Sequence, residues 1–130
     1  MIVDASAVLA ILMAEPDASR FAGALTHSAQ RTMSALNWLE AAIAVDRKGG
    51  PAARNEFESF FARAGIEIVP VTQELAVMAR QAHSDWGKRK PAWLNMGDCI
   101  AYALARQRGE PLLFKGNDFS QTDIEPALKD

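Results

Sequence analysis

Apolar residues along the chain follow two alternating patterns, one typical of buried strands and the other typical of amphipathic helices. Short apolar runs predict strands, because a strand of a parallel sheet is covered on both faces. Longer segments with apolar residues three and four positions apart predict helices between them. The predicted strands cover residues 1–4, 31–33, 66–71 and 111–114. The predicted helices cover residues 5–14, 16–28, 35–48, 51–64, 72–88 and 97–109.

Residues that favour helix ends support these boundaries. Ser34 and Thr72 suit the N-cap positions of two helices, and Gly65 follows the end of another. Strands that alternate with helices are typical of an α/β fold with a mainly parallel sheet. We therefore expect a single domain over residues 1–130, with a central sheet of four or five strands. The fifth would be an edge strand around Ile124.

Acidic residues lie where such a sheet binds ligands, at the carboxyl ends of its strands. Asp4 ends the first strand, Asp98 begins a nearly all-apolar helix, and Asp118 lies in the turn after the last strand. On helix 35–48, Glu40 shares a face with an apolar stripe that we expect to point inward. That stripe consists of Leu36, Leu39 and Ile43. Carboxylates gathered in one place repel one another unless a cation binds them, and hard oxygen ligands favour Mg²⁺ or Mn²⁺.

Each of these four residues also has a structural explanation, which the sequence leaves open. Asp4 and Asp98 would satisfy free backbone N–H groups at helix starts. Asp118 is of a type that is common in turns, and Glu40 would reach solvent from the edge of its stripe. The metal-site interpretation is favoured because three of the carboxylates are expected at one edge of the sheet and Glu40 is expected to point inward.

Other chemistries find little support in the composition. His27 and His83 fall on different predicted helices without metal-ligand spacing. Cys99 lies within an apolar helix, where we expect a small buried side chain rather than a nucleophile. The net charge of −2 does not indicate a nucleic-acid-binding surface. A site that holds divalent cations can nevertheless receive phosphates in an acidic protein.

The chain is expected to be cytoplasmic, with no membrane contact. Its apolar stretch at residues 5–14 is too short to cross a bilayer, which takes about 20 residues. The absence of leading basic residues argues against a signal peptide. A single cysteine also excludes an internal disulfide, as is usual in a reducing compartment.

Four segments together resemble a known family. MIVDASA, SALNWLE, NMGDCIAYALA and LLFKGNDFSQTDI, in this order and spacing, are similar to PIN-domain ribonucleases, specifically to VapC-like toxins of type II toxin–antitoxin pairs. The resemblance extends from residue 1 to about residue 124. It implies a three-layer α/β/α PIN-like fold. It also implies an Mg²⁺- or Mn²⁺-dependent endoribonuclease that hydrolyses RNA phosphodiester bonds.

The resemblance assigns roles to individual residues. Asp4, Glu40, Asp98 and Asp118 match the acidic residues that bind the metal and carry out catalysis. Many relatives carry Asp or Asn two positions before the DF pair, where this chain has Gly116. The matching small hydroxyl residues, which would support the site by hydrogen bonding or cap helices instead, are Ser6 and Ser34.

Basic residues near these acids are candidates for RNA binding. Lys115 follows the last predicted strand, beside the expected site. Lys88, Arg89 and Lys90 form a basic loop flanked by tryptophans, a combination that suits single-stranded RNA. A solvated loop with the tryptophans packed beneath it is the alternative.

The resemblance further implies two protein partners, a second copy in a homodimer and a cognate antitoxin whose C-terminal segment covers the acidic cleft. An alternative function is a catalytically weak PIN-like module that binds RNA or the antitoxin without cleavage. A different Mg²⁺-dependent phosphotransfer enzyme is disfavoured, because its motif would need an acidic residue where this chain has Ser6.

Overall fold

The structure is a computed structural model that describes residues 1–87 and 93–129. The strands are β1 (Ile2–Val3), β2 (Thr32–Ser34), β3 (Glu67–Val69) and β4 (Leu112–Leu113). The helices are α1 (Ala5–Leu12), α2 (Ala18–His27), α3 (Ala35–Lys48), α4 (Pro51–Ala64), α5 (Gln73–Ala82) and α6 (Met96–Arg108). Within the described residues, the four strands form one parallel sheet in the order β3-β2-β1-β4.

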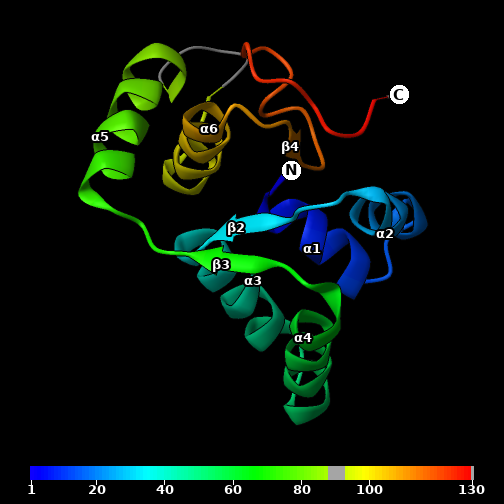
Figure 1. Cartoon of the computed structure of the whole chain (residues 1–130). Coiled ribbons are helices and arrows are strands. Elements are labelled where there is room, and N and C mark those ends of the chain that lie inside the picture. Colours follow the sequence, from blue (N-terminus) through cyan, green and yellow to red (C-terminus); the bar gives the residue numbers. More distant parts are fainter. Residues whose placement is uncertain (88–92, 130) are drawn as a thin grey trace.

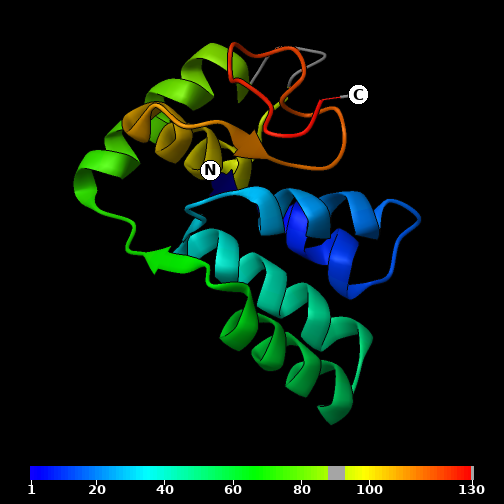
Figure 2. The same cartoon turned by 45° about the vertical axis from the view of Figure 1, so that its right-hand side comes forward.

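Helices cover both faces of this sheet (Figure 1). α5 and α6 lie on one face, and α1 to α4 lie on the other, as the turned view in Figure 2 also shows. Successive strand residues point to opposite faces. Ile2 and Leu112 therefore pack with α5 and α6, whereas Val3 and Leu113 pack with the other helices. The predicted three-layer α/β/α fold with a parallel sheet is confirmed.

The strand register brings three segments of the chain to the same edge of the sheet. Val3 pairs with Leu113, and the Asp4 N–H donates to the Leu113 carbonyl at 2.9 Å. β2 runs parallel beside β1 and ends at Ser34, the N-cap of α3. Asp4, the first turn of α3 and the segment after β4 therefore all begin at the carboxyl edge of the sheet.

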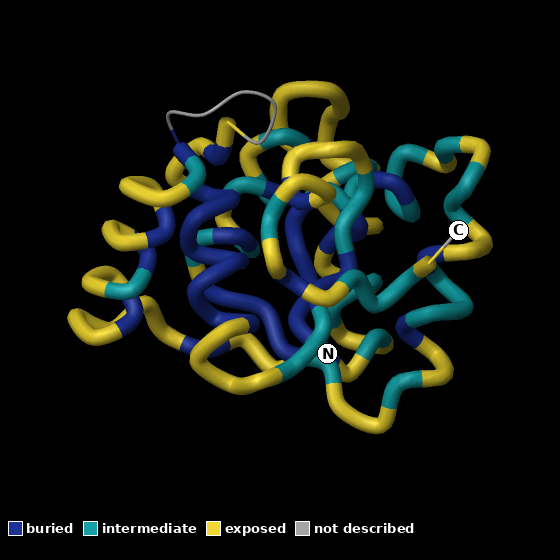
Figure 3. Tube along the Cα trace, turned by 90° about the horizontal axis from the view of Figure 1, so that it is seen from above, coloured by how far each residue is buried: buried dark blue, intermediate teal, exposed yellow. Residues whose placement is uncertain are grey.

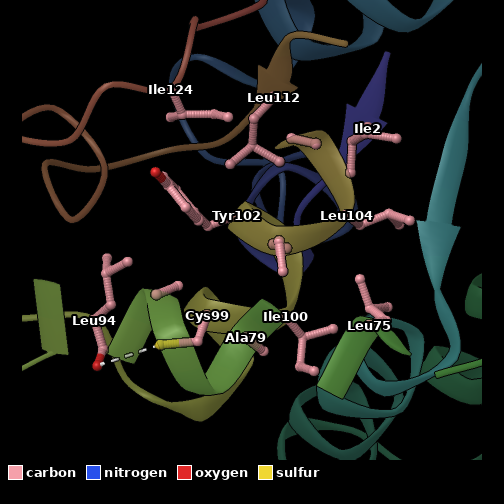
Figure 4. Packing of buried hydrophobic residues seen from close by; sticks show 14 of the residues in the cluster. Ile2, Leu75, Ala79, Leu94, Cys99, Ile100, Tyr102, Leu104, Leu112 and Ile124 are labelled. Atoms are coloured by element: carbon pink, nitrogen blue, oxygen red, sulfur yellow. Dashed lines mark hydrogen bonds between the residues drawn. The ribbon is translucent and has the colours of Figure 1, made fainter. Parts of the chain in front are cut away.

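α6 is the most thoroughly buried helix among the described residues, and it is dark blue along most of its length in Figure 3. In Figure 4, Ile100 lies near Leu75 and Ala79 of α5, and Leu104 belongs to the same core cluster as Ile2. Cys99 is buried in the same cluster, which confirms the small buried side chain expected there. Nevertheless, neither α6 nor any other helix within residues 1–87 and 93–129 is long and apolar enough to cross a membrane.

The apolar stripe predicted for α3 is only partly correct: Leu36 packs against the core, but the inward orientation predicted for Leu39 and Ile43 was wrong. Leu39 and Ile43 are 46% and 42% exposed. The buried residues of α3 are instead Asn37, Ala41 and Val45. α3 contacts α1, α4 and α6. Small side chains let helices approach closely, and a buried amide is tolerated where it finds polar partners. A prediction from hydrophobicity alone therefore assigned the wrong face of α3 to the core.

Most other boundaries differ from the prediction by one or two residues, and two differences are larger. α5 ends at Ala82 and continues as a π-helical turn, His83–Gly87, instead of running to residue 88. The C-terminal segment adds a single bridge between Leu112 and Pro126, rather than an edge strand around Ile124. Ile124 is buried in the core. Proline has no N–H to donate, so it is confined to the edge of a sheet.

Candidate active site

Asp4 is held at the carboxyl end of β1 by a serine. Its Oδ2 accepts hydrogen bonds from the Ser6 backbone N–H at 3.1 Å and from Ser6 Oγ at 2.6 Å. Ser6 Oγ in turn accepts from the Lys115 backbone N–H at 2.9 Å. Ser6 thereby links the end of β1 to the chain leaving β4. Asp4 is only 6% exposed, so its carboxylate is largely removed from solvent.

Asp98 occupies the first turn of α6 in a reciprocal capping box. Asp98 Oδ2 accepts from the Asn95 N–H at 3.1 Å, and Asn95 Oδ1 accepts from the Asp98 N–H at 2.9 Å. The capping explanation therefore holds for Asp98, and also for Asp4, which caps α1. It does not exclude ligand binding, because a carboxylate has two oxygens with about four lone-pair sites.

Glu40 reaches the same region from α3 and is half-buried. Its Oε1 accepts a hydrogen bond from Asn37 Nδ2 at 2.8 Å. Asn37 is fully buried and accepts from Ser34 Oγ at 2.6 Å. Asn37 Nδ2 also donates to the Gly97 carbonyl, next to Asp98, at 3.0 Å. Glu40 is thus tied through an amide to the start of α6.

Burial and neighbouring charges raise the pKa values of Asp4 and Asp98. The pKa of Asp98 is raised from 3.8 to about 7, mainly by burial and in smaller part by the charges of Asp4, Asp118 and Glu40, while the hydrogen bond from the Asn95 backbone lowers it. Burial also raises the pKa of Asp4 to about 6, with a contribution from Glu40, although its hydrogen bonds lower it. The structure therefore brings Asp4, Glu40 and Asp118 within electrostatic range of Asp98.

The chemistry of this cluster fits a divalent cation. Carboxylates supply only hard oxygen donors, which Mg²⁺ and Mn²⁺ prefer. Within residues 1–87 and 93–129, no three Asp, Glu, His or Cys side chains converge closely enough to hold a metal ion as they stand. Without a cation, like charges keep the carboxylates apart, and a bound ion would let the exposed Asp118 side chain approach the other three. The residues that would hold it are Asp4, Glu40, Asp98 and Asp118.

The turn after β4 explains one departure from the family pattern. Asp118 is exposed in this turn. Gly116 has a φ angle of 102°, in a region that glycine adopts without the steric cost of a Cβ atom. An acidic residue at position 116 would be strained in this backbone conformation. Asp118 is therefore the acidic residue that this turn offers to the site.

The part of the chain that the structure describes does not test the predicted RNA contacts. Lys115 Nζ lies 2.5 Å from Glu15 Oε1 and 3.0 Å from Asp17 Oδ1. These hydrogen bonds raise the pKa of Lys115. A phosphate would compete with both carboxylates for this ammonium group, and its contact with Lys115 stays a prediction. The basic loop Lys88–Lys90 lies outside the described residues.

Comparison with protein families identifies the family to which this chain belongs. The family model described as "PIN domain" matches residues 1–125 of this chain. The chain belongs to the PIN-domain family. Ribonuclease VapC28 of Mycobacterium tuberculosis is 44% identical to this PIN domain over 130 residues, which cover 98% of each chain. The resemblance to VapC-like PIN-domain proteins is therefore confirmed.

Solved structures show the same fold for this PIN domain. The crystal structure of VapC20 of Mycobacterium tuberculosis, described as a sarcin-ricin loop cleaving toxin, aligns with a TM-score of 0.78 and 17% identity over 95% of both chains. A toxin–antitoxin complex from Klebsiella pneumoniae aligns with a TM-score of 0.71 and 15% identity, over 94% of this chain and 92% of that one. At these identities the likeness concerns the fold alone.

Two asparagines of the PIN domain were missed by the sequence reasoning. Asn37 contacts Glu40, and Asn95 caps the helix that carries Asp98. A signal for Asn37 was present, because Ser34, Asn37 and Glu40 are spaced three positions apart and thus share a helix face. Asn95 precedes Asp98 by three positions, which is the spacing of a capping box.

The raised pKa values predict how the stability of this PIN domain depends on pH. The unfolded pKa near 3.8 lies below the folded values of about 6 for Asp4 and about 7 for Asp98. Between these pH values the folded chain binds more protons, so their contribution to stability falls as pH rises from about 4 through 7.

The Asp98→Asn variant isolates this effect, because an amide oxygen can still accept the Asn95 hydrogen bond. Without metal, its stability advantage over the unmodified chain should grow from near zero at pH 4 to about 2 kcal/mol at pH 8. Without solvent screening, the raised pKa of Asp98 would correspond to about 4 kcal/mol, and screening reduces this expected difference in stability. Urea denaturation in EDTA across this pH range measures it. A constant difference between the two proteins would contradict the assigned pKa shift.

Proposed function

We propose that this PIN domain is an Mg²⁺- or Mn²⁺-dependent endoribonuclease that acts as the toxin of a toxin–antitoxin pair. The observation that carries the proposal is the placement of two buried carboxylates, Asp4 and Asp98, at helix starts on the carboxyl edge of the sheet. The charge of Glu40 acts on both, and the charge of Asp118 acts on Asp98. The similarity to a protein named ribonuclease VapC28, over nearly the whole of both chains, supports RNA as the substrate.

The structure suggests different roles for the four acidic residues. Asp4 and Asp98 are buried and fixed by caps, so they are the ligands with the least freedom. Glu40 and Asp118 are more accessible and would complete the site, either through water or as the base that accepts a proton from the attacking water. A bound divalent ion would supply the Lewis acidity that activates water and neutralises charge on the leaving oxygen.

RNA cleavage by the purified chain tests the proposal. With millimolar Mn²⁺, we expect internal cuts in a pool of labelled single-stranded RNAs, and none when EDTA replaces the ion. Expression in a bacterial host should arrest growth, and co-expression of a cognate antitoxin should restore it. Intact RNA after incubation of the folded protein with Mn²⁺ and Mg²⁺ would contradict the enzymatic assignment.

A cognate antitoxin, a homodimer and a cytoplasmic location complete the proposal. The structural neighbour described as a toxin–antitoxin complex supports a protein partner. Leu39 and Ile43 on α3 are exposed apolar residues that a second copy would cover. Sedimentation velocity at micromolar concentration should therefore show a dimer. A monomer across this concentration range would remove the homodimer from the proposal.

The basic loop is proposed to hold the RNA backbone. Replacing Lys88, Arg89 and Lys90 by Ala should weaken the binding of many RNA sequences alike, since phosphate contacts carry little sequence information. Each lost contact should reduce the log–log salt slope by about 0.7 for a single strand. RNA affinity measured at several salt concentrations tests this. An unchanged slope together with lost antitoxin binding would instead assign the loop to the protein partner.

A further inference from the structure

Asn37 is a polar residue on the buried face of a helix. Both of its side-chain polar atoms are hydrogen-bonded. It is fully buried in the first turn of α3. Its Oδ1 accepts from Ser34 Oγ at 2.6 Å, and its Nδ2 donates to Glu40 Oε1 at 2.8 Å and to the Gly97 carbonyl at 3.0 Å. A carboxamide has one oxygen acceptor and two N–H donors, so these contacts use both donors.

The absence of a side chain at Gly97 leaves space for the Glu40 carboxylate. A Cβ atom built on Gly97 would overlap both carboxylate oxygens and the Cδ atom of Glu40. The carboxylate therefore packs directly on the backbone of α6, one residue before Asp98. Gly97 does not have a positive φ angle, unlike Gly65, Gly109 and Gly116. Space for Glu40, rather than backbone conformation, accounts for glycine at this position.

We propose that Asn37 is a positioning residue that holds the Glu40 carboxylate in the space left by Gly97, and so sets Glu40 beside Asp98 for cation binding. Glu40 is only half-buried, so without the amide its side chain would turn toward solvent and away from the other negative charges. The Ser34 hydroxyl orients the amide, because it takes the Oδ1 atom and directs both N–H groups toward Glu40 and Gly97. This role rests on the proposed function, in which Glu40 belongs to the cation site.

A purely structural role makes a different prediction. If Asn37 only joined α3 to α6 through the Gly97 carbonyl, its loss would disturb the site whether or not Glu40 were present. If Asn37 acts through Glu40, its loss should matter only when Glu40 is there. The two readings can therefore be separated by combining variants of Asn37 and Gly97 with Glu40→Ala.

The experiment measures Mn²⁺ affinity by titration calorimetry of the purified full chain, without RNA. Asn37→Leu removes the amide at similar volume, and Gly97→Ala displaces the carboxylate while leaving Asn37 in place. Each should weaken Mn²⁺ binding about tenfold or more in the presence of Glu40, as outer-sphere changes at metal sites do. Each should change it less than about twofold in the Glu40→Ala background. If Asn37→Leu does not fold, Asn37→Ser replaces it, because serine removes the amide donor to Glu40 and keeps a small polar side chain beside Ser34.

Matched controls come from exposed or open positions. Gly23→Ala on α2 adds the same methyl group where no atom lies within 4 Å of the new Cβ. Asn55→Leu repeats the amide-to-leucine change at an exposed position of α4. Both should leave Mn²⁺ affinity unchanged.

Three results would overturn the positioning role. The first is an equal loss of Mn²⁺ affinity in the Asn37 and Gly97 variants with and without Glu40. The second is no loss of Mn²⁺ affinity in these variants when Glu40 is present. The third is no Mn²⁺ binding by the unmodified chain. The first two leave the proposed function standing if the unmodified chain still cleaves RNA with Mn²⁺. The third removes the cation site itself, and with it the metal dependence of the proposed function.

Discussion

Replacing Asp98 by Asn is expected to abolish RNA cleavage while the chain stays folded. The residue is buried at the start of α6, and the charges of the three other acidic residues act on it. Its amide analogue preserves shape and the capping hydrogen bond but removes the negative charge that a divalent cation requires. Because outer-sphere changes already cost about 10–100-fold, loss of a direct ligand should reduce the cleavage rate by at least about a hundredfold. Asp4→Asn should behave in the same way.

Single-turnover cleavage of a labelled RNA at saturating Mn²⁺ measures the effect, with circular dichroism to show that the variants are folded. Asp46→Asn serves as the control, because Asp46 is exposed on α3 and its ion pair with Arg54 is long, at 3.8 Å. It should cleave at the rate of the unmodified chain. Full activity in both folded site variants, Asp98→Asn and Asp4→Asn, would refute the assignment of the acidic cluster as the catalytic centre.

Adding Mn²⁺ or Mg²⁺ should raise the melting temperature of the unmodified chain. A cation that binds only the folded state relieves the repulsion among the four carboxylates and stabilises the fold by mass action. At a concentration one hundred times its dissociation constant the gain is about 2.7 kcal/mol. For a chain of this length, that gain corresponds to roughly 10 °C. Differential scanning calorimetry with and without millimolar ion measures the shift.

The Asp98→Asn variant gives this experiment its control for non-specific ion effects. Without metal it should melt above the unmodified chain at pH 8, since it lacks a buried charge that destabilises the fold. With metal its melting temperature should rise far less. Asp46→Asn, by contrast, should show the full metal-dependent increase. An equal increase in all three proteins would mean that the ions stabilise the fold without occupying the acidic site.

The sequence was informative wherever structure depends on local interactions. The alternation of apolar runs with amphipathic segments predicted the parallel α/β sheet, because strands covered on both faces must be apolar throughout. The positions of Asp4 and Asp98 were predictable for the same local reason. Each lies where a strand or helix boundary meets the carboxyl edge of the sheet.

The sequence was less informative where one helix packs against another. The face of α3 was assigned to Leu39 and Ile43 because hydrophobic periodicity weighs only the helix itself. The structure buries Asn37 and Ala41 instead. Which face of a helix is covered depends on the size and polarity of the neighbouring helices, and no pattern within residues 35–48 contains that information.

Taken alone, the amino-acid sequence determined the order of strands and helices, the caps at their ends, and the supply of carboxylates at one edge of the sheet. Only the tertiary structure decided how Glu40 joins the others. Its place depends on a hydrogen bond between Asn37 and Gly97, which are 60 positions apart in the chain, and on the missing side chain of Gly97. Such a contact exists only after α3 and α6 have packed together, because it depends on the distance between two helices rather than on the preference of either.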